Sequence, residues 1–91
     1  MQKGKLKLNK AFLYRSNMSL HILTGKLLTG SIAKGYRLNN GSEEIAEIEI
    51  LEGITVTNGS TNFIIVVLFF DTKFNISSLY NTELSVTFYY W

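Results

Sequence analysis

Short alternations of apolar and polar residues, separated by turns rich in glycine and asparagine, run through most of this chain. Residues 5–9 alternate lysine or asparagine with leucine, and residues 83–91 alternate in the same way up to the last residue. A period of two is typical of a β-strand with one solvated face. The first strand is therefore predicted over residues 5–15, with a bend or bulge where the pattern shifts at Lys10–Ala11.

The stretch 20–39 organises the middle of the chain. Three glycines stand five residues apart in it: Gly25, Gly30 and Gly35. Glycine supplies a positive φ at turns, or lets two backbones approach closely inside a strand. The spacing predicts strands over residues 21–28 and 32–38 that meet at a tight turn near 29–31, with a second bend at 34–35. Gly25, in the middle of its strand, is predicted to mark a close approach or a bulge.

The segment 42–53 (SEEIAEIEILEG) is ambiguous. Ser42 suits a helix N-cap followed by acids in the first turn, and Gly53 suits the position after a helix. Against a helix, glutamates and isoleucines alternate over residues 47–50 with a period of two. Local evidence leaves both alternatives open, and the predicted strands on either side favour a strand.

The later part of the chain contains its most apolar segment, Phe63–Phe70. Before it, residues 54–57 continue the extended chain and residues 58–62 are predicted to form a loop; after it, residues 71–81 are expected to be mostly irregular. A membrane helix needs about 20 apolar residues, so this run predicts a buried strand. Because both of its faces are apolar, we expect a partner protein or a second copy of the chain to cover the outer one.

These elements predict an all-β protein: a small closed Greek-key barrel of six or seven strands, in a single domain spanning residues 1–91. The 46% of apolar residues excludes intrinsic disorder, and the absence of cysteine excludes disulfides and thiolate metal sites. The basic N-terminal segment lacks the apolar core of a secretory signal. A cytoplasmic protein with no membrane association is expected.

The central residues resemble the second domain of the translational GTPases, the β-barrel of elongation factor Tu and its relatives. Residues 21–27 (HILTGKL) and 30–38 (GSIAKGYRL) follow the family pattern T-V-x-T-G-r-V-x-x-G-x-i-k-x-G-d-x-l, and residues 44–49 (EIAEIE) stand where the family has I-x-x-I-e. The run 64–70 is similar to a late V-x-L-x-L strand. The resemblance covers residues 11–84 and implies the same kind of barrel.

The sequence also departs from that family. Tyr36 replaces a common aspartate, Thr61–Asn62 replaces a glycine-aspartate turn, and Asn81 stands at a late glycine. No G-x-x-x-x-G-K-[ST] phosphate-binding motif occurs, so GTP hydrolysis is not carried over. In the family this barrel is a binding element that contacts tRNA or ribosomal RNA and docks against neighbouring domains, and the resemblance implies a role of that kind.

No catalytic constellation is recognisable. His21 is the only histidine, and no cysteine or acidic partner stands at metal-ligand spacing from it. The glutamates of residues 43–52 are expected to form the solvated face of a strand, and no G-x-S-x-G elbow supports a serine nucleophile. The chain is therefore expected to be no enzyme and to hold no cofactor or metal.

Basic and aromatic residues form the one candidate binding set. Its possible RNA-contacting members are Lys5, Lys7, Lys10, Arg15, Lys26, Lys34, Arg37, Tyr14 and Tyr36. Small barrels bind RNA by combining basic residues with stacking aromatics, whereas lysines on an edge strand also serve to prevent strand pairing. Two hypotheses follow: a binding module for RNA or a ribosome-associated partner, and a protein-interaction or assembly module with no nucleic-acid role.

Overall fold

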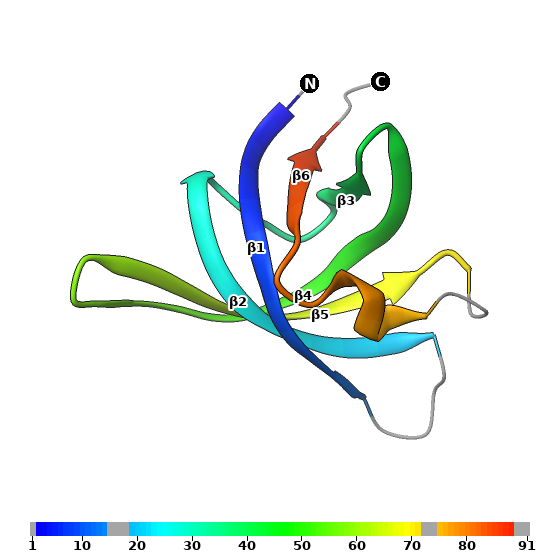
Figure 1. Cartoon of the computed structure of the whole chain (residues 1–91), viewed down its shortest axis with the longest axis horizontal. Coiled ribbons are helices and arrows are strands. Elements are labelled where there is room, and N and C mark those ends of the chain that lie inside the picture. Colours follow the sequence, from blue (N-terminus) through cyan, green and yellow to red (C-terminus); the bar gives the residue numbers. More distant parts are fainter. Residues whose placement is uncertain (1, 15–18, 72–74, 89–91) are drawn as a thin grey trace.

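The computed structural model describes residues 2–14, 19–71 and 75–88. The described residues form strands and one short 3-10 helix, shown in Figure 1. The elements are β1 (Gln2–Leu13), β2 (Leu20–Gly30), β3 (Arg37–Asn40), β4 (Glu43–Thr57), β5 (Ser60–Phe69), η1 (Ile76–Leu79) and β6 (Glu83–Thr87).

The strands close into a barrel in the order β1-β2-β5-β4-β3-β6, and every neighbouring pair is antiparallel. The strands β3, β4 and β5 follow one another as hairpins. The chain then returns through η1 so that β6 lies beside β3, which is a Greek-key arrangement. The predicted all-β, closed Greek-key barrel is therefore confirmed, with six strands.

Alternate residues of all the strands fill the barrel. The largest buried side chains are Leu6, Leu8, Leu23, Leu38, Ile48, Phe63, Ile65, Val67, Leu79, Leu84 and Val86. Since successive side chains of a strand point to opposite faces, the polar residues between them turn outward. The alternation seen in residues 5–9 is thus the signature of a barrel wall.

Residues 43–53 of the ambiguous segment lie in a strand, as the predicted strands on either side favoured, and Ser42 lies in the turn before it. The strand is β4, which bulges between Ile48 and Ile50 and again between Leu51 and Gly53. The bend predicted in β1 is also present, as a register shift between Leu8 and Lys10. Bulges of this kind increase the local twist that a small closed barrel requires.

The hairpin predicted at residues 29–31 is wrong. The neighbours of β2 are β1 and β5, and β3 lies across the barrel. Gly30 has a φ of +74°, and a Cβ there would overlap the carbonyl oxygen of Lys3 in β1. The glycine therefore permits a close approach to β1 at the end of β2, after which the chain crosses to β3.

Two further predictions are wrong at their boundaries. Residues 31–36 form the crossing connection, with the predicted bend at 34–35, and β3 occupies only Arg37–Asn40. The predicted loop 58–62 is a two-residue turn, because Asn58 and Gly59 both have positive φ (52° and 79°) and Thr57 pairs with Ser60. Two positive φ values in a two-residue loop are typical of a type I′ turn.

The tight turn gives the molecule a hairpin that reaches beyond the barrel. Figure 1 shows the far ends of β4 and β5 projecting to one side, away from β3 and β6.

The last strand, β6, stops at Thr87, and residues 89–91 of the predicted last strand lie outside the described residues. In the described part of the chain, no helix has the length and apolar character to cross a membrane.

Candidate functional site

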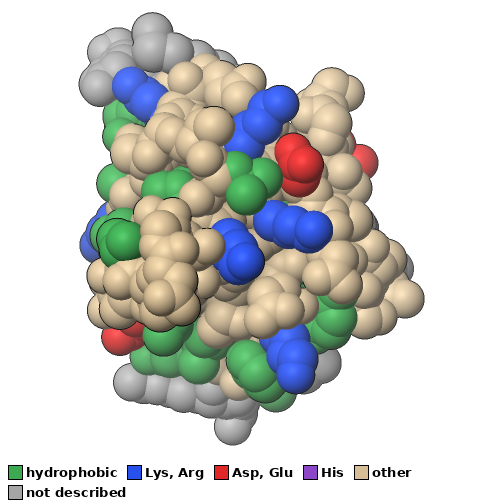
Figure 2. Space-filling view, turned by 60° about the vertical axis from the view of Figure 1, so that its left-hand side comes forward, with side chains coloured by type: hydrophobic (Ala, Val, Ile, Leu, Met, Phe, Trp, Pro, Cys, Tyr) green, Lys and Arg blue, Asp and Glu red, His purple; other side chains and the backbone are tan. Residues whose placement is uncertain are grey.

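The outer surface of β1 and β2 carries a group of lysines, here called the lysine face. Its exposed members are Lys5, Lys7, Lys10 and Lys26. Lys7 of β1 lies directly opposite Lys26 of β2, and Lys10 lies opposite Thr24. Figure 2 shows basic side chains spread over this side of the molecule, with few acidic ones between them.

Lys5, Lys7 and Lys26 do not protect a strand edge. Lys5 is paired with Thr29 on one side and with Ser85 on the other, and Lys7 lies between Lys26 and Glu83. Both neighbouring strands are therefore in place, and no unpaired edge exists at this point for a lysine to shield. Glu83 stands opposite Lys7, but among the described residues the two form no ion pair within 4.0 Å.

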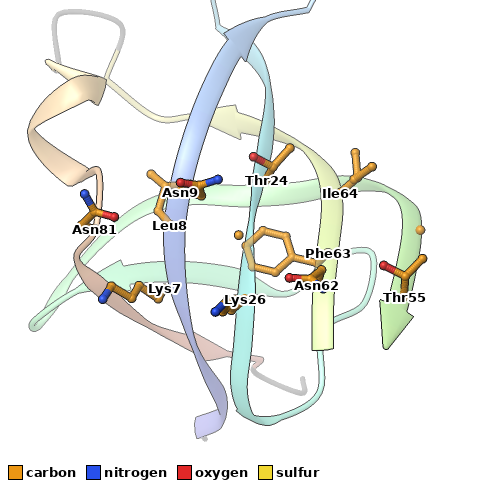
Figure 3. A pocket seen from close by; sticks show the side chains of 12 residues that line it. Lys7, Leu8, Asn9, Thr24, Lys26, Thr55, Asn62, Phe63, Ile64 and Asn81 are labelled. Carbon is orange, nitrogen blue, oxygen red and sulfur yellow. The ribbon is translucent and has the colours of Figure 1, made fainter. Parts of the chain in front are cut away.

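A groove with a volume of about 510 Å³ begins at the lysine face and crosses four strands (Figure 3). One of its sides is a continuous row of register partners: Lys7 of β1, Lys26 of β2, Asn62 of β5 and Thr55 of β4. Apart from the two ammonium groups, this row offers an amide and a hydroxyl. The side chains are therefore suited to a ligand rich in hydrogen-bond acceptors.

The opposite side of the groove is less polar. Thr24, Ile64 and Gly53 are register partners two residues further along the same strands. Between the two rows lie the core residues Leu8 and Phe63, which form the floor because they are buried. The groove thus has one basic, polar wall and one wall of small and apolar side chains.

Gly25 determines how closely this floor is packed. A Cβ at this position would overlap the carbonyl oxygen of Lys7 and come within 2.9 Å of Cζ of Phe63. The glycine predicted to mark a close approach therefore does so, between β1 and β2 and directly beneath the groove. Asn81, which stands at the family's late glycine, has a φ of +64° and lines the groove next to Leu8.

The remaining basic candidates are not part of the lysine face. Arg37 of β3 donates a hydrogen bond to Glu44 (2.9 Å) and lies 3.6 Å from Glu47, which is its register partner. Its charge is therefore largely neutralised within the fold. Tyr36 stacks on Phe88 with ring centroids 5.0 Å apart, and Lys34 is an exposed residue of the same crossing connection.

The other aromatic candidate is also distant from the groove. Tyr14 follows β1, and its backbone N–H donates to the carbonyl of Leu20, close to the loop that joins β1 to β2. Arg15 lies outside the described residues. Of the nine candidates, the structure thus brings the four lysines together and leaves Tyr14, Lys34, Tyr36 and Arg37 elsewhere on the barrel.

An apolar strip runs over the outer wall, as expected for Phe63–Phe70. Phe12, Ile22, Val66 and Ile50 are register partners on four neighbouring strands. Within it Val66 is only 1% exposed, whereas Phe12 is 52% exposed. The strip exists, and its cover by a partner or a second copy stays a prediction.

His21 is a packing residue. Its ring meets Phe69 edge-on, with centroids 5.4 Å apart. Burial lowers the pKa of His21, and a hydrogen bond with the Ser19 backbone partly opposes that shift. The described residues contain no group of three histidine or acidic side chains placed to hold a metal ion.

Sequence analysis missed the polar half of the groove. Asn62 falls in the predicted loop 58–62 and Thr55 in a stretch with no predicted role, although the Asn58–Gly59 dipeptide carries the necessary signal. A two-residue turn at that point fixes the register of the hairpin, and the register sets Asn62 opposite Thr55. The alignment of these residues with Lys26 depends on β2, which is distant in sequence.

Comparisons with protein-family models, curated proteins and solved structures found no match to this chain. What is established is therefore the architecture, a closed antiparallel six-stranded barrel, with a lysine-lined groove on its outer wall.

Proposed function

We propose that this protein is a non-catalytic binding module whose lysine face and groove hold the phosphate backbone of single-stranded RNA. The observation that carries the proposal is the direct pairing of Lys7 with Lys26 on strands that have neighbours on both sides. Like charges directly opposite one another destabilise a sheet, and here they protect no edge. A bound anionic ligand offsets the repulsion between the two opposed ammonium groups.

The shape of the groove favours an extended strand over a compact ligand. The row from Lys7 to Thr55 spans three inter-strand steps, about 14 Å at the usual strand spacing. Phosphates near the two lysines place the sugars and their hydroxyls within reach of Asn62 and Thr55. The less polar wall at Ile64 then faces the rest of the nucleotide.

The composition of the groove also predicts how selective the binding is. Proteins that recognise bases usually stack them on exposed aromatic rings. Here the only aromatic side chain of the lining is Phe63, which is buried in the core. We expect contacts to phosphate and sugar, with weak dependence on base sequence and strong dependence on salt.

The resemblance to the elongation-factor barrel supports the same conclusion. In that family the barrel is a binding element that contacts tRNA or ribosomal RNA, and this chain offers no catalytic constellation. RNA carried by ribosomes or by ribosome-associated partners is the natural source of the ligand under this proposal.

The apolar strip of Phe12, Ile22, Val66 and Ile50 favours a second candidate, a protein-assembly module with no RNA role. The two functions differ in their response to salt. Phosphate binding weakens steeply as salt rises, whereas burial of apolar surface does not.

The test is fluorescence anisotropy with an unstructured RNA of about 12 nucleotides, over about 50 to 200 mM salt. Contact through all four lysines predicts a slope of log K against log salt near −2.8, from about 0.7 per phosphate on a single strand. The double variant Lys7→Gln/Lys26→Gln is expected to halve that slope, to about −1.4. The matched control is Lys34→Gln, an exposed lysine away from the face. Binding that ignores salt, or that falls equally in the control, contradicts the proposal.

A further inference from the structure

The two halves of β4 have different neighbours. Residues 43–47 pair with β3, and from Ala46 onward β4 also pairs with β5. The last backbone bonds on the β3 side join Ile48 to Gly35 and Tyr36, each 2.8 Å long. Residues 50–57 pair with β5 alone. Within the described residues, no backbone hydrogen bond reaches the other side of this segment. The projecting hairpin therefore has an unpaired strand edge.

This edge lacks the usual protection against pairing. Natural edge strands carry lysines, prolines, inward charges or bulges. Residues 53–57 (GITVT) contain no charge and no proline, and both bulges of β4 lie before them. Their apolar side chains are accessible, with Ile54 44% and Val56 71% exposed. Such a segment is a site for strand addition.

We propose that residues 53–57 pair, antiparallel, with the same residues of a second copy of the chain, about a two-fold axis at Thr55. Such a contact is isologous, because each copy offers the same surface to the other. The proposal concerns a backbone interface, and it is separate from the apolar strip on the outer wall.

The turn at Asn58–Gly59 determines which backbone groups are available. In a two-residue hairpin, the residues flanking the turn exchange hydrogen bonds, and the bonded and non-bonded pairs then alternate along the ladder. Thr57 and Thr55 consequently direct their N–H and C=O groups toward β5. Ile54 and Val56 direct theirs to the free edge, where no partner lies within the described chain.

A two-fold axis at Thr55 gives every outward N–H and C=O group of Ile54 and Val56 a hydrogen-bond partner. It sets Ile54 opposite the partner's Val56 and Val56 opposite the partner's Ile54, so that both pairs exchange hydrogen bonds. The nearest charged residue, Glu52, falls opposite the partner's Asn58. No like charges meet along the interface. The segment therefore pairs with its own copy both through backbone hydrogen bonds and without charge repulsion, which favours a second copy over an arbitrary peptide.

The dimer also has a consequence that rests on the proposed function. A two-fold axis at Thr55 brings the Thr55 residues of both copies together, and Thr55 ends the polar row of the groove. The row of Lys7, Lys26, Asn62 and Thr55 would then continue into the same row of the partner, in reverse order. Two lysine faces would lie at the ends of one longer groove.

Sedimentation velocity without RNA tests the interface itself, with the full chain at about 50 µM and in a dilution series. The wild-type chain is expected to form dimers. Val56→Pro removes an N–H of the free edge but none that bonds to β5, so it is expected to weaken dimerisation at least about tenfold. Val56→Lys, which adds charge to the edge, is expected to do the same.

Two matched variants complete the test. Val56→Thr keeps a β-branched side chain and its N–H, and is expected to dimerise within about threefold of wild type. Phe12→Gln changes the exposed end of the apolar strip and is expected to leave dimerisation unchanged. Circular dichroism and melting temperature establish that each variant is folded.

A wild-type chain that is monomeric throughout the series overturns the proposal. So does a dimer that persists in folded Val56→Pro and Val56→Lys, or one that only Phe12→Gln dissociates. Because RNA is absent, none of these outcomes bears on the proposed function, and a loss of RNA binding in the lysine variants leaves the dimer untouched.

Discussion

One strand, β4, shows how differently similar sequences behave in two parts of this molecule. Ile48, in the half between β3 and β5, has no exposed surface, whereas Val56, in the projecting half, is 71% exposed. Both halves carry β-branched residues among polar ones. The difference is a second neighbouring backbone, formed by β3 and residues 35–36, which only the barrel half has. Closure of the barrel, more than local pattern, decides whether an isoleucine of β4 stabilises the fold.

This contrast separates two roles. The barrel half of β4, with the strands around it, holds the core and therefore accounts for the free energy of unfolding. The hairpin half contributes the far end of the groove and an unpaired edge. Substitutions in the barrel are expected to change stability, and substitutions in the hairpin to change what the protein binds.

The largest contrast is expected from one substitution made at two glycines. Gly25→Val places a side chain against the carbonyl oxygen of Lys7 and the ring of Phe63, while Gly53→Val meets no atom within 4 Å. We expect Gly25→Val to destabilise by about 4 kcal/mol or more, close to the whole stability of a small domain. We expect Gly53→Val to change stability by less than about 0.5 kcal/mol.

Urea denaturation of both variants provides the measurement. Comparable destabilisation by the two would contradict the close approach of β1 and β2 at Gly25. It would equally contradict the openness of the hairpin at Gly53.

A second pair of variants tests β4 alone. Ile48→Ala removes a fully buried side chain and is expected to cost about 2–5 kcal/mol. Ile54→Ala makes the same chemical change where the side chain is 44% exposed, and is expected to cost less than about 1 kcal/mol. Denaturation at low protein concentration keeps self-association out of the comparison.

Equal losses in the two alanine variants would mean that the hairpin is packed as tightly as the barrel. A larger loss at Ile54 that appears only at high protein concentration would instead report the dimer, because dimerisation raises apparent stability by mass action.

Sequence pattern was sufficient for most strands and insufficient for their arrangement. Alternation correctly predicted β1 and the described part of β6, because a period of two survives wherever one face of a strand is buried. The glycine spacing predicted β2, and for β4 the neighbouring strands favoured a strand over a helix. Gly25 and Gly35 lie at the predicted close approach and bend, whereas the hairpin predicted at Gly30 is wrong. A positive φ permits a tight turn and equally permits contact with a third strand, here β1. The local sequence does not distinguish a tight turn from a contact with a third strand.

The candidate site was predictable only in part, for a related reason. Lys5 and Lys7 share one face of one strand, so their proximity follows from spacing alone. Lys26 lies beside them because of the register of β1 with β2. Arg37 is not part of the lysine face, because it lies on β3 and pairs with its register partner Glu47. Register depends on the complete ladder, so the eight described candidates separate into a lysine face of four and four residues with other roles.

The smallest expected effect concerns His21, at the barrel end of β2. Burial lowers the pKa of His21 below 6.5, and the ring packs on Phe69. The folded protein therefore binds a proton less readily than the unfolded chain does. The stability that follows from the neutral ring is complete above about pH 6.5 and is lost as the pH falls through that value toward the folded pKa.

The variant His21→Gln lacks this group. The wild type is therefore expected to lose slightly more stability than the variant between about pH 7.5 and 5.5, a range in which carboxylates with ordinary pKa values change little. Urea midpoints at the two pH values provide the comparison. Identical losses would show that the imidazole is solvated in the native barrel, and a smaller loss in the wild type would reveal an anionic neighbour that stabilises the charged ring.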